Sequence, residues 1–528
     1  MMERRIPVLK TVAGLRCFVR TVRSTPFNAA QADVLGQIGW VPTMGALHVG
    51  HLSLMKRARQ ENAVVIVSLF VNPLQFGPAE DWAQYPRTLD ADLDLCREVG
   101  VDAVFVPEAA ELVSVAPMTQ VVPPATLTET LCGRSRPGHF QGVATIVTKL
   151  LHLVQPDRAY FGRKDAQQLA IIQRLVEDLN LTTEIVPCPI VREPSGLAYS
   201  SRNQYLDFDQ AQKATLLSQS LARAEDLFRA GIRDRDSLFN AVQSTLAQDP
   251  EVQVEYIELV DPRTLESLTQ AHPVGMLAIA ARIGSTRLID NSILDGRKPI
   301  LAIDGPAGAG KSTVTRLCAA RLGLLYLDTG AMYRAITWLV LQSGFDLADE
   351  VAIADLVSQA AIDLQPGQQP TDPLQVQVNG TDVTQAIRSL TVTRQVSAVA
   401  AQPAVRDILR QQQQAYARWG GVAAEGRDMG TQIFPDAGLK IFLTASNAER
   451  ARRRYTELEI DGTVEVSYEQ LVLDIAERDR KDSQRAVAPL CKAADAVEIL
   501  TDGLSIEDVV AKIVHLYQER CPEPTRGV

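Results

Sequence analysis

Two short stretches of this chain combine residue types that suit the binding of nucleotide phosphates. One is Met44-Gly45-Ala46-Leu47-His48-Val49-Gly50-His51, a turn of small residues with two histidines. The other is Gly305-Pro306-Ala307-Gly308-Ala309-Gly310-Lys311-Ser312, which fits the Walker A pattern of P-loop proteins. Because the two stretches use different chemistry on phosphate, the sequence predicts two enzymes fused head to tail.

The histidine turn joins a predicted strand, Ile38–Val41, to a helix predicted from Gly50 onward. Small residues in such a turn let a polyphosphate approach the backbone and the helix N-terminus. The imidazoles of His48 and His51 would donate hydrogen bonds there, to charge that builds on an α-phosphate during attack. Two histidines at this spacing could also bind a metal or pack as a structural pair, but no third ligand is evident nearby in the sequence.

The Walker A stretch follows a predicted strand, Ile300–Ile303, and opens a predicted helix, Lys311–Leu322. In this context backbone amides surround the β-phosphate, Lys311 reaches the β- and γ-phosphate oxygens, and Ser312 coordinates Mg²⁺. The loop by itself predicts nucleotide binding and does not indicate a kinase.

The composition narrows the class of protein. A chain of 528 residues is too long for one hydrophobic core, so about two to four domains are expected. A net charge of −10 argues against a protein built to hold nucleic acid polymers. The seven widely spaced cysteines include no CxxC pair, which indicates ordinary thiols in a reducing compartment such as the cytoplasm. No apolar run approaches the ~20 residues that span a bilayer, so no membrane partner is expected.

The N-terminal segment allows two interpretations. Residues 4–32 carry six basic and no acidic side chains, as organellar targeting peptides do. Within them, however, Val12, Leu15 and Val19 have helical spacing just ahead of a strand. This spacing favours a structural role.

The elements that must position the first site alternate between apolar strands and amphipathic helices, which predicts a parallel, doubly wound α/β sheet. After Ile38–Val41 the predicted strands are Val64–Phe70, Val104–Val106, Arg158–Phe161 and Glu184–Val186, and the predicted helices include Leu52–Glu61 and Ala166–Leu179.

From about Arg192 the pattern changes. A loop, Leu197–Asn203, leads into a polar helical region, Gln210–Ala247, and then into predicted strands at Val252–Leu259 and Gly275–Ile283, so we expect a second, smaller α/β domain that closes near Asn291.

Five further blocks accompany the histidine turn in the first half. They are Phe70-Val71-Asn72-Pro73-Leu74-Gln75-Phe76, Tyr85-Pro86-Arg87-Thr88, Arg136-Pro137-Gly138-His139-Phe140, Gly162-Arg163-Lys164-Asp165-Ala166-Gln167-Gln168 and Ser200-Ser201-Arg202-Asn203. The turn is similar to that of the nucleotidyl-transferase superfamily, and the six blocks together resemble pantothenate synthetase (pantoate–β-alanine ligase) over roughly residues 6–292. The resemblance implies a Rossmann-like domain in residues 1–191 and a small α/β subdomain in residues 192–292.

In that family pantoate attacks the α-phosphorus of ATP, which leaves a pantoyl adenylate and pyrophosphate. β-Alanine then attacks the carbonyl carbon, giving pantothenate and AMP, and the enzymes are commonly homodimers. The resemblance implies catalytic roles for His48, His51 and Lys164. It also implies an ATP site made by residues 44–51 together with Gly162, Arg163, Lys164, Asp165, Val191, Tyr199, Ser200, Ser201 and Arg202.

Pantoate and β-alanine would be bound by Gln75, Gln168 and Asn72, because side-chain amides both donate and accept hydrogen bonds. Taken singly, each could be an ordinary loop residue, and Arg136–Phe140 could be purely structural. Two positions depart from the family pattern: Arg163 stands where glutamate is usual, and Tyr199 where a smaller aliphatic residue is usual. These departures put nucleotide affinity in question.

Three blocks in the second half resemble cytidylate kinase, over about Pro299–Glu519 and including a strand-rich insert around Leu374–Asp382. The blocks are Asp328-Thr329-Gly330-Ala331-Met332-Tyr333-Arg334, Glu425-Gly426-Arg427-Asp428-Met429-Gly430-Thr431 and residues 478–490, from Arg478 to Leu490. The resemblance implies a P-loop nucleoside-monophosphate kinase domain in residues 299–528, which makes CDP and dCDP from CMP and dCMP with ATP and Mg²⁺. Dispersed arginines are expected, because phosphoryl transfer between two anions depends on positioning and charge neutralisation.

The resemblance assigns the Walker stretch and Thr313 to ATP, with a catalytic role for Lys311. It assigns CMP binding and a mobile lid to Thr329, Arg334, Ser397, Arg406, Arg427, Asp428, Arg478, Asp482 and Arg485. Two other polar stretches, Arg450–Arg454 and Gln411–Gln414, are predicted to be solvated helix faces.

Two other functions stay open at this point. The first half could stop at an adenylylated product, as other nucleotidyl transferases do, although the blocks around Gln75 and Gln168 favour the ligase. The second half could be an inactive nucleotide sensor, although the phosphate-handling residues named above favour a kinase.

Overall fold

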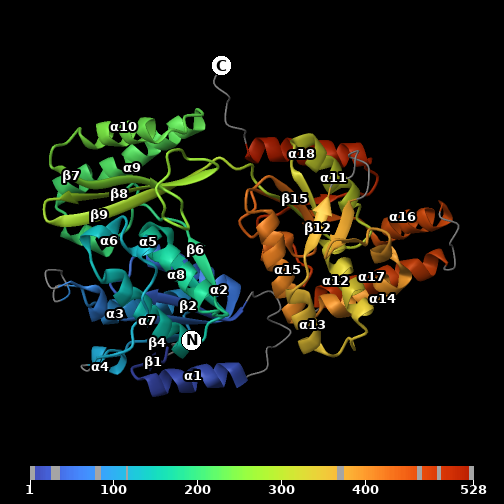
Figure 1. The fold of residues 1–528 in the computed structure, drawn as a ribbon, viewed down its shortest axis with the longest axis horizontal. Helices are drawn as coiled ribbons and strands as arrows, with labels where there is room; N and C mark the ends of the chain where they lie inside the picture. The colour runs from blue at the N-terminus through green and yellow to red at the C-terminus, as the bar shows by residue number, and fades with distance from the viewer. Residues whose placement is uncertain are drawn as a thin grey trace. The chain divides into compact units, whose positions relative to one another are not determined.

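The structure is a computed structural model that describes residues 6–24, 36–77, 82, 85–114, 117–365, 374–460, 467–484 and 489–521. Its contacts divide the chain into two compact units, with the boundary between Gly296 and Arg297. In Figure 1 the first unit runs from blue to yellow-green and the second from yellow to red.

The first unit is built on a six-stranded parallel sheet in the order β1-β4-β3-β2-β5-β6. Its strands are β1 (Val8–Leu9), β2 (Gly36–Thr43), β3 (Asn62–Leu69), β4 (Ala103–Phe105), β5 (Arg158–Gly162) and β6 (Glu184–Cys188). The predicted strands are confirmed, and β1 is an unpredicted edge strand. The strand order reverses at β2, and ligands bind past the carboxyl ends of strands at such a point. The first site is therefore expected at the carboxyl ends of β2 and β5.

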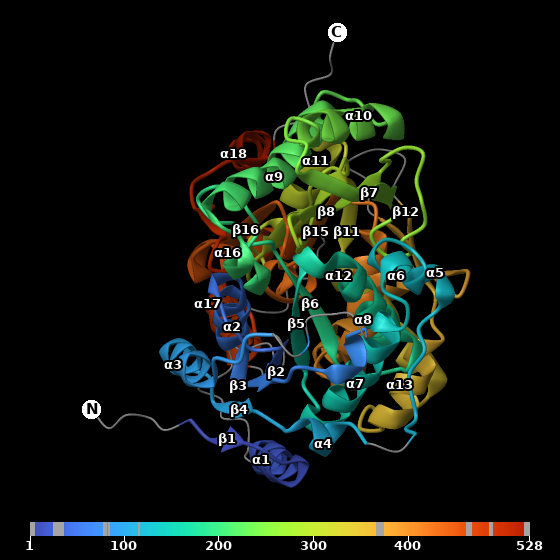
Figure 2. The ribbon, with the colours of Figure 1, turned by 90° about the vertical axis from the view of Figure 1, so that its left-hand side faces the viewer.

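Helices cover both faces of this sheet, as Figure 2 shows. The helices α2 (Val49–Glu61) and α3 (Leu89–Val99) pack on one face, and α1 (Val12–Ser24), α7 (His139–Val154) and α8 (Ala166–Asp178) pack on the other. Leu15 and Val19 of α1 are buried in the core. The structural role predicted for the N-terminal segment is thus confirmed for residues 12–24.

A second part of the first unit contains an antiparallel sheet of β7 (Val252–Val260), β8 (Val274–Ile283) and β9 (Thr286–Asp295). The strand β9 was not predicted, and it extends the subdomain beyond Asn291. The helical region predicted at Gln210–Ala247 is confirmed, and it consists of two helices, α9 (Phe208–Arg229) and α10 (Arg235–Leu246). The break occurs because Asp234 caps α10, its carboxylate accepting a hydrogen bond from the Ser237 amide at 2.8 Å.

The second unit contains a five-stranded parallel sheet in the order β11-β15-β10-β16-β17. The strands are β10 (Leu301–Asp304), β11 (Leu325–Asp328), β15 (Val422–Gly426), β16 (Leu439–Thr444) and β17 (Val497–Leu500). On one face lie α11 (Lys311–Leu322) and α18 (Ile506–Arg520), and on the other lie α12 (Thr329–Ser343), α13 (Glu350–Ser358) and α15 (Pro403–Tyr416). The phosphate loop therefore leaves the central strand of the sheet, which confirms the predicted strand and helix on either side of it.

The strand-rich insert is also present, as an antiparallel sheet of β12 (Ile362–Gln365), β13 (Gln375–Val378) and β14 (Thr381–Asp382). The remaining long helices of this unit are α14 (Leu390–Ala400), α16 (Asn447–Ile460) and α17 (Tyr468–Gln484). The two predicted solvated faces lie on α15 and α16, and both predictions are wrong in part. Gln413 is fully buried, because it continues the buried face of α15 that Val405 and Leu409 begin at helical spacing, and Arg450 of α16 is also buried.

All seven cysteines are free thiols. Within the described ranges, no helix is long and apolar enough to cross a membrane.

Candidate active sites

The histidine turn begins where β2 ends, and His48 occupies the N-cap position of α2. Four successive backbone amides of the turn have acceptors within the protein. They are Gly45 to Thr43 Oγ1 (3.1 Å), Ala46 to Asp92 Oδ2 (3.0 Å), Leu47 to Asp92 Oδ1 (2.8 Å) and His48 to His51 Nδ1 (3.3 Å). The turn is held in one conformation by these bonds, and its imidazoles rather than these four amides are left for a ligand.

Asp92, on α3, is the residue that fixes this turn, and the sequence did not reveal it. Its side chain is buried and also accepts a hydrogen bond from Thr88 Oγ1 at 3.2 Å. Nothing in the sequence distinguishes it from Asp90 and Asp94 on the same helix. Only the folded chain shows that one of the three carboxylates faces the turn.

Both histidines are neutral near pH 7. Removal from solvent, helped by the charge of Lys164, lowers the pKa of His48 to about 4. Removal from solvent, with contributions from His48 and Lys164, lowers the pKa of His51 to about 3. Since His51 Nδ1 accepts a hydrogen bond from the His48 amide, the hydrogen-bond network assigns the His51 proton to Nε2. His48 Nδ1 is buried and has no partner among the residues described.

The spacing of the turn has a steric reason. The imidazole rings of His48 and His51 lie 4.0 Å apart at their centroids. A Cβ atom at Gly50 would lie 2.9 Å from Cε1 of His48, so a side chain there would displace the ring. Tyr199, one of the two departures from the family pattern, stacks on His48 with 6.0 Å between centroids, and its amide donates to the Val191 carbonyl at 3.0 Å. Tyr199 therefore contacts His48, to which the family resemblance assigns a catalytic role.

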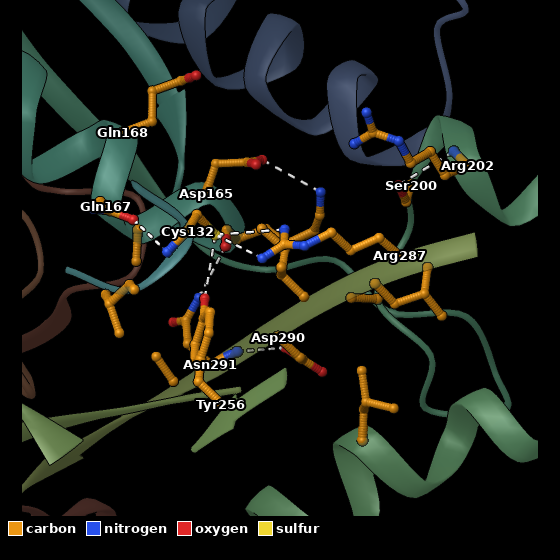
Figure 3. A pocket seen from close by; sticks show the side chains of 18 of the residues that line it. Cys132, Asp165, Gln167, Gln168, Ser200, Arg202, Tyr256, Arg287, Asp290 and Asn291 are labelled. Carbon is orange, nitrogen blue, oxygen red and sulfur yellow. Dashed lines mark hydrogen bonds and ion pairs between the residues drawn. The ribbon is translucent and has the colours of Figure 1, made fainter. Parts of the chain in front are cut away.

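A cavity in the first unit is lined by loops of the parallel sheet and by strands of the antiparallel sheet (Figure 3). Its predicted lining residues are Lys164, Asp165, Gln168, Ser200 and Arg202, together with Arg136 and His139 from the block at residues 136–140. Its unpredicted ones include Cys132, Tyr256, Arg287 and Asn291. Lys164 forms an ion pair with Asp165 at 3.3 Å, and the Asn291 amide donates to the carbonyls of Arg163 at 2.9 Å and Lys164 at 3.0 Å. The end of β5 is thus held from the antiparallel sheet.

Gln75 lies beside the histidine turn, because its side-chain amide donates to the sulfur of Met44 at 2.8 Å. Asn72 is buried and donates to Gln75 Oε1 and to the Gly142 carbonyl, both at 3.2 Å. His139 Nδ1 lies 2.7 Å from the Gln75 carbonyl, to which Arg136 also donates at 3.3 Å. The block at 136–140 therefore positions Gln75.

Other blocks meet in the same region. Tyr85 and Ser201 share a hydrogen bond of 3.3 Å, and Ser200 Oγ accepts from the Arg202 amide at 3.3 Å. Gln167 is buried and donates to the carbonyls of Leu127 and Thr130, and both Gln167 and its neighbour Gln168 line the cavity. The side-chain amide of Gln167 thus holds the segment from Leu127 to Thr130 at the wall of the cavity.

In the second unit, the phosphate loop turns tightly after β10. A Cβ atom at Gly305 would lie 2.0 Å from the Leu443 carbonyl oxygen, so only glycine fits. Lys311 is buried and donates to the Pro306 carbonyl at 2.8 Å. Burial lowers the pKa of Lys311, and the positive charge of Arg427 lowers it further.

Glu425, at the end of β15, is a site residue without a role in the sequence prediction. It is buried and accepts hydrogen bonds from Ser312 Oγ at 2.9 Å and from the Tyr326 hydroxyl. Burial raises the pKa of Glu425. Hydroxyl and carboxylate oxygens are ligands that suit Mg²⁺, so the donor set of Ser312 and Glu425 fits that ion beside bound phosphates. Among the described residues, no group of three or more His, Cys, Asp or Glu side chains is placed to hold a metal ion by itself.

Three predicted arginines converge near Lys311. Burial lowers the pKa of the Arg478 guanidinium, and the neighbouring charges of Arg427 and Arg334 lower it as well. Arg427 donates to Asp482 at 3.2 Å, and Arg334 donates to Asp328 at 3.3 Å. Such a concentration of positive charge suits a phosphate group. Arg485, the fourth predicted arginine of this set, lies outside the described residues.

The residues predicted to recognise the base are partly brought together. Arg406 and Asp428 form a buried ion pair, and the Arg406 guanidinium lies 5.6 Å from the ring centroid of Tyr333. Ser397 is exposed on α14. Thr329 is buried, and its hydroxyl donates to the Glu425 carbonyl at 2.7 Å. Thr329 therefore joins α12 to β15.

Both units match known protein families. The pantoate-beta-alanine ligase family profile matches residues 8–293, and the cytidylate kinase profile matches residues 301–519. A bifunctional pantoate ligase/cytidylate kinase of Trichormus variabilis is 58% identical over 97% of this chain and 99% of its own length. The protein of the same description from Acaryochloris marina is 59% identical over 98% of this chain and 99% of its own length. The chain belongs to this bifunctional family.

A solved structure supports the same assignment for the first unit. Pantothenate synthetase from Thermus thermophilus is 42% identical, with a TM-score of 0.51, and the match covers 55% of this chain and 100% of that one. The family assignment confirms both predicted folds and both predicted activities. The chain is an enzyme with a pantoate–β-alanine ligase half and a cytidylate kinase half.

We predict that Asp92→Asn weakens the ligase half. The amide nitrogen of asparagine would face a backbone N–H that now donates to a carboxylate oxygen, so one donor of the turn would lose its acceptor. Leaving such a donor unsatisfied costs about 1–3 kcal/mol. Calorimetry should show a less stable first unit, and pantothenate synthesis should fall with it. Asp90→Asn, an exposed position on the same helix, is the matched control.

A second prediction concerns acid stability. Because the folded pKa values of His48 and His51 lie below the ordinary value of 6.5, the unfolded chain binds protons between pH 6.5 and about 4 that the folded chain does not. The melting temperature of the ligase half should therefore fall as pH is lowered through this window. His51→Asn should flatten this fall, whereas His152→Asn, exposed on α7, should not. An unchanged slope in His51→Asn would show that the histidine is not held neutral by the fold.

Proposed function

We propose that the first unit binds the α-phosphate of ATP between the histidine pair and the Lys164 ammonium. Two neutral imidazoles can donate hydrogen bonds to the phosphate, and Lys164 and Arg202 add the charge that the released pyrophosphate requires. The proposal is supported by the buried, unpartnered His48 Nδ1 and by the Nε2 proton assigned to His51. The pantoate carboxylate attacks the α-phosphorus from this arrangement.

Pantoate is held by Gln75 and Gln168, whose amides match its hydroxyls and carboxylate. Asn72 acts through Gln75, since it is buried and donates to that side chain. β-Alanine then attacks the carbonyl carbon of the adenylate, and AMP leaves. Shielding the adenylate within the cavity limits its loss to water.

In the second unit Lys311 and the backbone of the phosphate loop hold the β- and γ-phosphates of ATP. Ser312 and Glu425 would hold Mg²⁺, which supplies charge neutralisation at the phosphates when it is bound. Arg334 and Arg427 hold the phosphate of CMP, and Arg478 neutralises charge on the group in transfer. The Arg406–Asp428 pair orients polar groups toward the base, so that a wrong base would leave buried donors or acceptors unpaired.

The observation that carries this assignment is a difference in charge between the two sites, one at the histidine turn after β2 and the other around the phosphate loop after β10. The ligase site offers neutral imidazoles to the phosphorus under attack, while the kinase site gathers one lysine and three arginines. We further propose that dCMP is accepted as well as CMP, that the ligase half forms a homodimer and that the enzyme is cytoplasmic. The division into domains at residues 1–191, 192–292 and 299–528 also remains our proposal.

Two single variants of the full-length enzyme test the separation of the sites. Lys311→Ala should abolish CDP formation and leave pantothenate synthesis unchanged, because the lysine belongs only to the P-loop site. Lys164→Ala should lower pantothenate synthesis by about 10²–10³-fold and leave CDP formation unchanged. The assay follows AMP and pantothenate in one tube and CDP in another. A stable adenylylated product in place of pantothenate would support the nucleotidyl-transferase alternative, and ligase activity that fell with Lys311→Ala would support the sensor alternative.

A further inference from the structure

One buried arginine of the kinase half contacts the phosphate loop and does not belong to the predicted nucleotide site. Arg450 lies on α16 and is 2% exposed. Its guanidinium donates to the Ala307 carbonyl in the phosphate loop at 3.0 Å and to the Ala445 carbonyl, just after β16, at 3.1 Å. The side chain thus fixes the backbone of the loop against the end of a neighbouring strand.

The same guanidinium reaches a third segment. It donates to both carboxylate oxygens of Asp479 on α17, with Nη1 at 2.9 Å from Oδ1 and Nη2 against Oδ2. A two-point contact of this kind fixes the relative orientation of its partners as well as their distance. Arg450 therefore ties the phosphate loop to α17.

Helix α17 carries residues of the proposed transfer site. Arg478 is adjacent to Asp479 in the sequence, and Asp482 accepts a hydrogen bond from Arg427. The helix is thereby held at two points, Asp479 against Arg450 and Asp482 against Arg427. Arg478 immediately precedes the first of these two points in the sequence, and its side chain lies among the charges that surround Lys311.

We propose that Arg450 and Asp479 are a positioning pair, which couples the conformation of the phosphate loop to the placement of Arg478. The proposal rests on the phosphate-binding roles proposed above for Lys311, Arg427 and Arg478. In this arrangement neither member of the pair contacts a substrate. The pair acts by holding α17 where the Arg478 guanidinium meets the phosphoryl group in transfer.

The primary test is Asp479→Asn in the full-length enzyme, assayed with ATP, Mg²⁺ and CMP. The substitution keeps the shape of the side chain but loses one of the two charged contacts, so α17 should shift relative to the loop. A misplacement of about 1 Å costs on the order of 10²-fold in rate, so kcat should fall by about 10–100-fold. The KM values for ATP and CMP should stay within about 3-fold, since the loss is specific to the transition state.

Two further variants separate positioning from general stability. Asp474→Asn, on the same helix, removes a carboxylate that accepts from Gln470 within the helix at 2.8 Å, and it should leave kcat unchanged. Asp479→Glu keeps the charge and should restore most of the lost kcat. Pantothenate synthesis by the same preparations should be unchanged in every variant.

A double-variant cycle tests the pair itself. Arg450→Lys should lower kcat, and Arg450→Lys with Asp479→Asn should be no slower than the slower single variant, because both remove the same contact. Losses that multiply would overturn the proposal, as would an effect confined to KM or a kcat for Asp479→Asn equal to that of Asp474→Asn. The unaltered enzyme is assayed first. A failure of that enzyme to form CDP would contradict the proposed function, which keeps the two failures distinct.

Discussion

Each active site depends on a buried carboxylate that accepts hydrogen bonds from two successive backbone amides. In the ligase half Asp92 holds Ala46 and Leu47 of the histidine turn. In the kinase half Asp304 holds Met429 and Gly430, both at 2.7 Å, and burial raises its pKa to about 6. A loop that binds phosphate must keep its shape before the phosphate arrives, since ordering it during the reaction would raise the barrier. Asp92 supplies that order to the histidine turn, and Asp304, on the strand that leads into the phosphate loop, fixes the segment that follows Arg427.

Both halves share such a buried carboxylate, but they place charged side chains differently because they break different bonds of ATP. Attack on the α-phosphorus brings a carboxylate toward a phosphate, and we propose that neutral imidazoles, backed by Lys164 and Arg202, stabilise the charge that builds there. Transfer of the γ-phosphoryl group brings together two phosphorylated nucleotides, so the second site concentrates Lys311, Arg427 and Arg478. Burial lowers the pKa values of Lys311 and Arg478, and the repulsion between these gathered charges lowers them further.

The sequence predicted the features that depend on local pattern and on consecutive motifs. The predicted strands of the first parallel sheet, strand β10 of the second, the phosphate loop and the helix after it follow from residues close together in the chain. Asp92 and Arg450 could not be predicted in this way, because their roles come from contacts with residues far away in the sequence. Gln413 was missed for a related reason: a glutamine run looks solvated until helical spacing with Val405 and Leu409 shows which face is buried. The roles of individual site residues, including Ser397 and Arg485, stay predictions.

If one chain breaks ATP at two different bonds in two separate sites, one carboxylate oxygen of pantoate should pass to AMP, the other should stay in the amide of pantothenate, and neither should reach a product of the kinase half. The most direct test supplies pantoate labelled with ¹⁸O in its carboxylate, together with β-alanine, CMP, ATP and Mg²⁺, and analyses the products by mass spectrometry. We predict one labelled oxygen in each AMP formed with pantothenate, and no label in CDP or ADP. Label in inorganic phosphate with ADP in place of AMP would contradict this division, because the acid would then have been activated by attack on the γ-phosphorus.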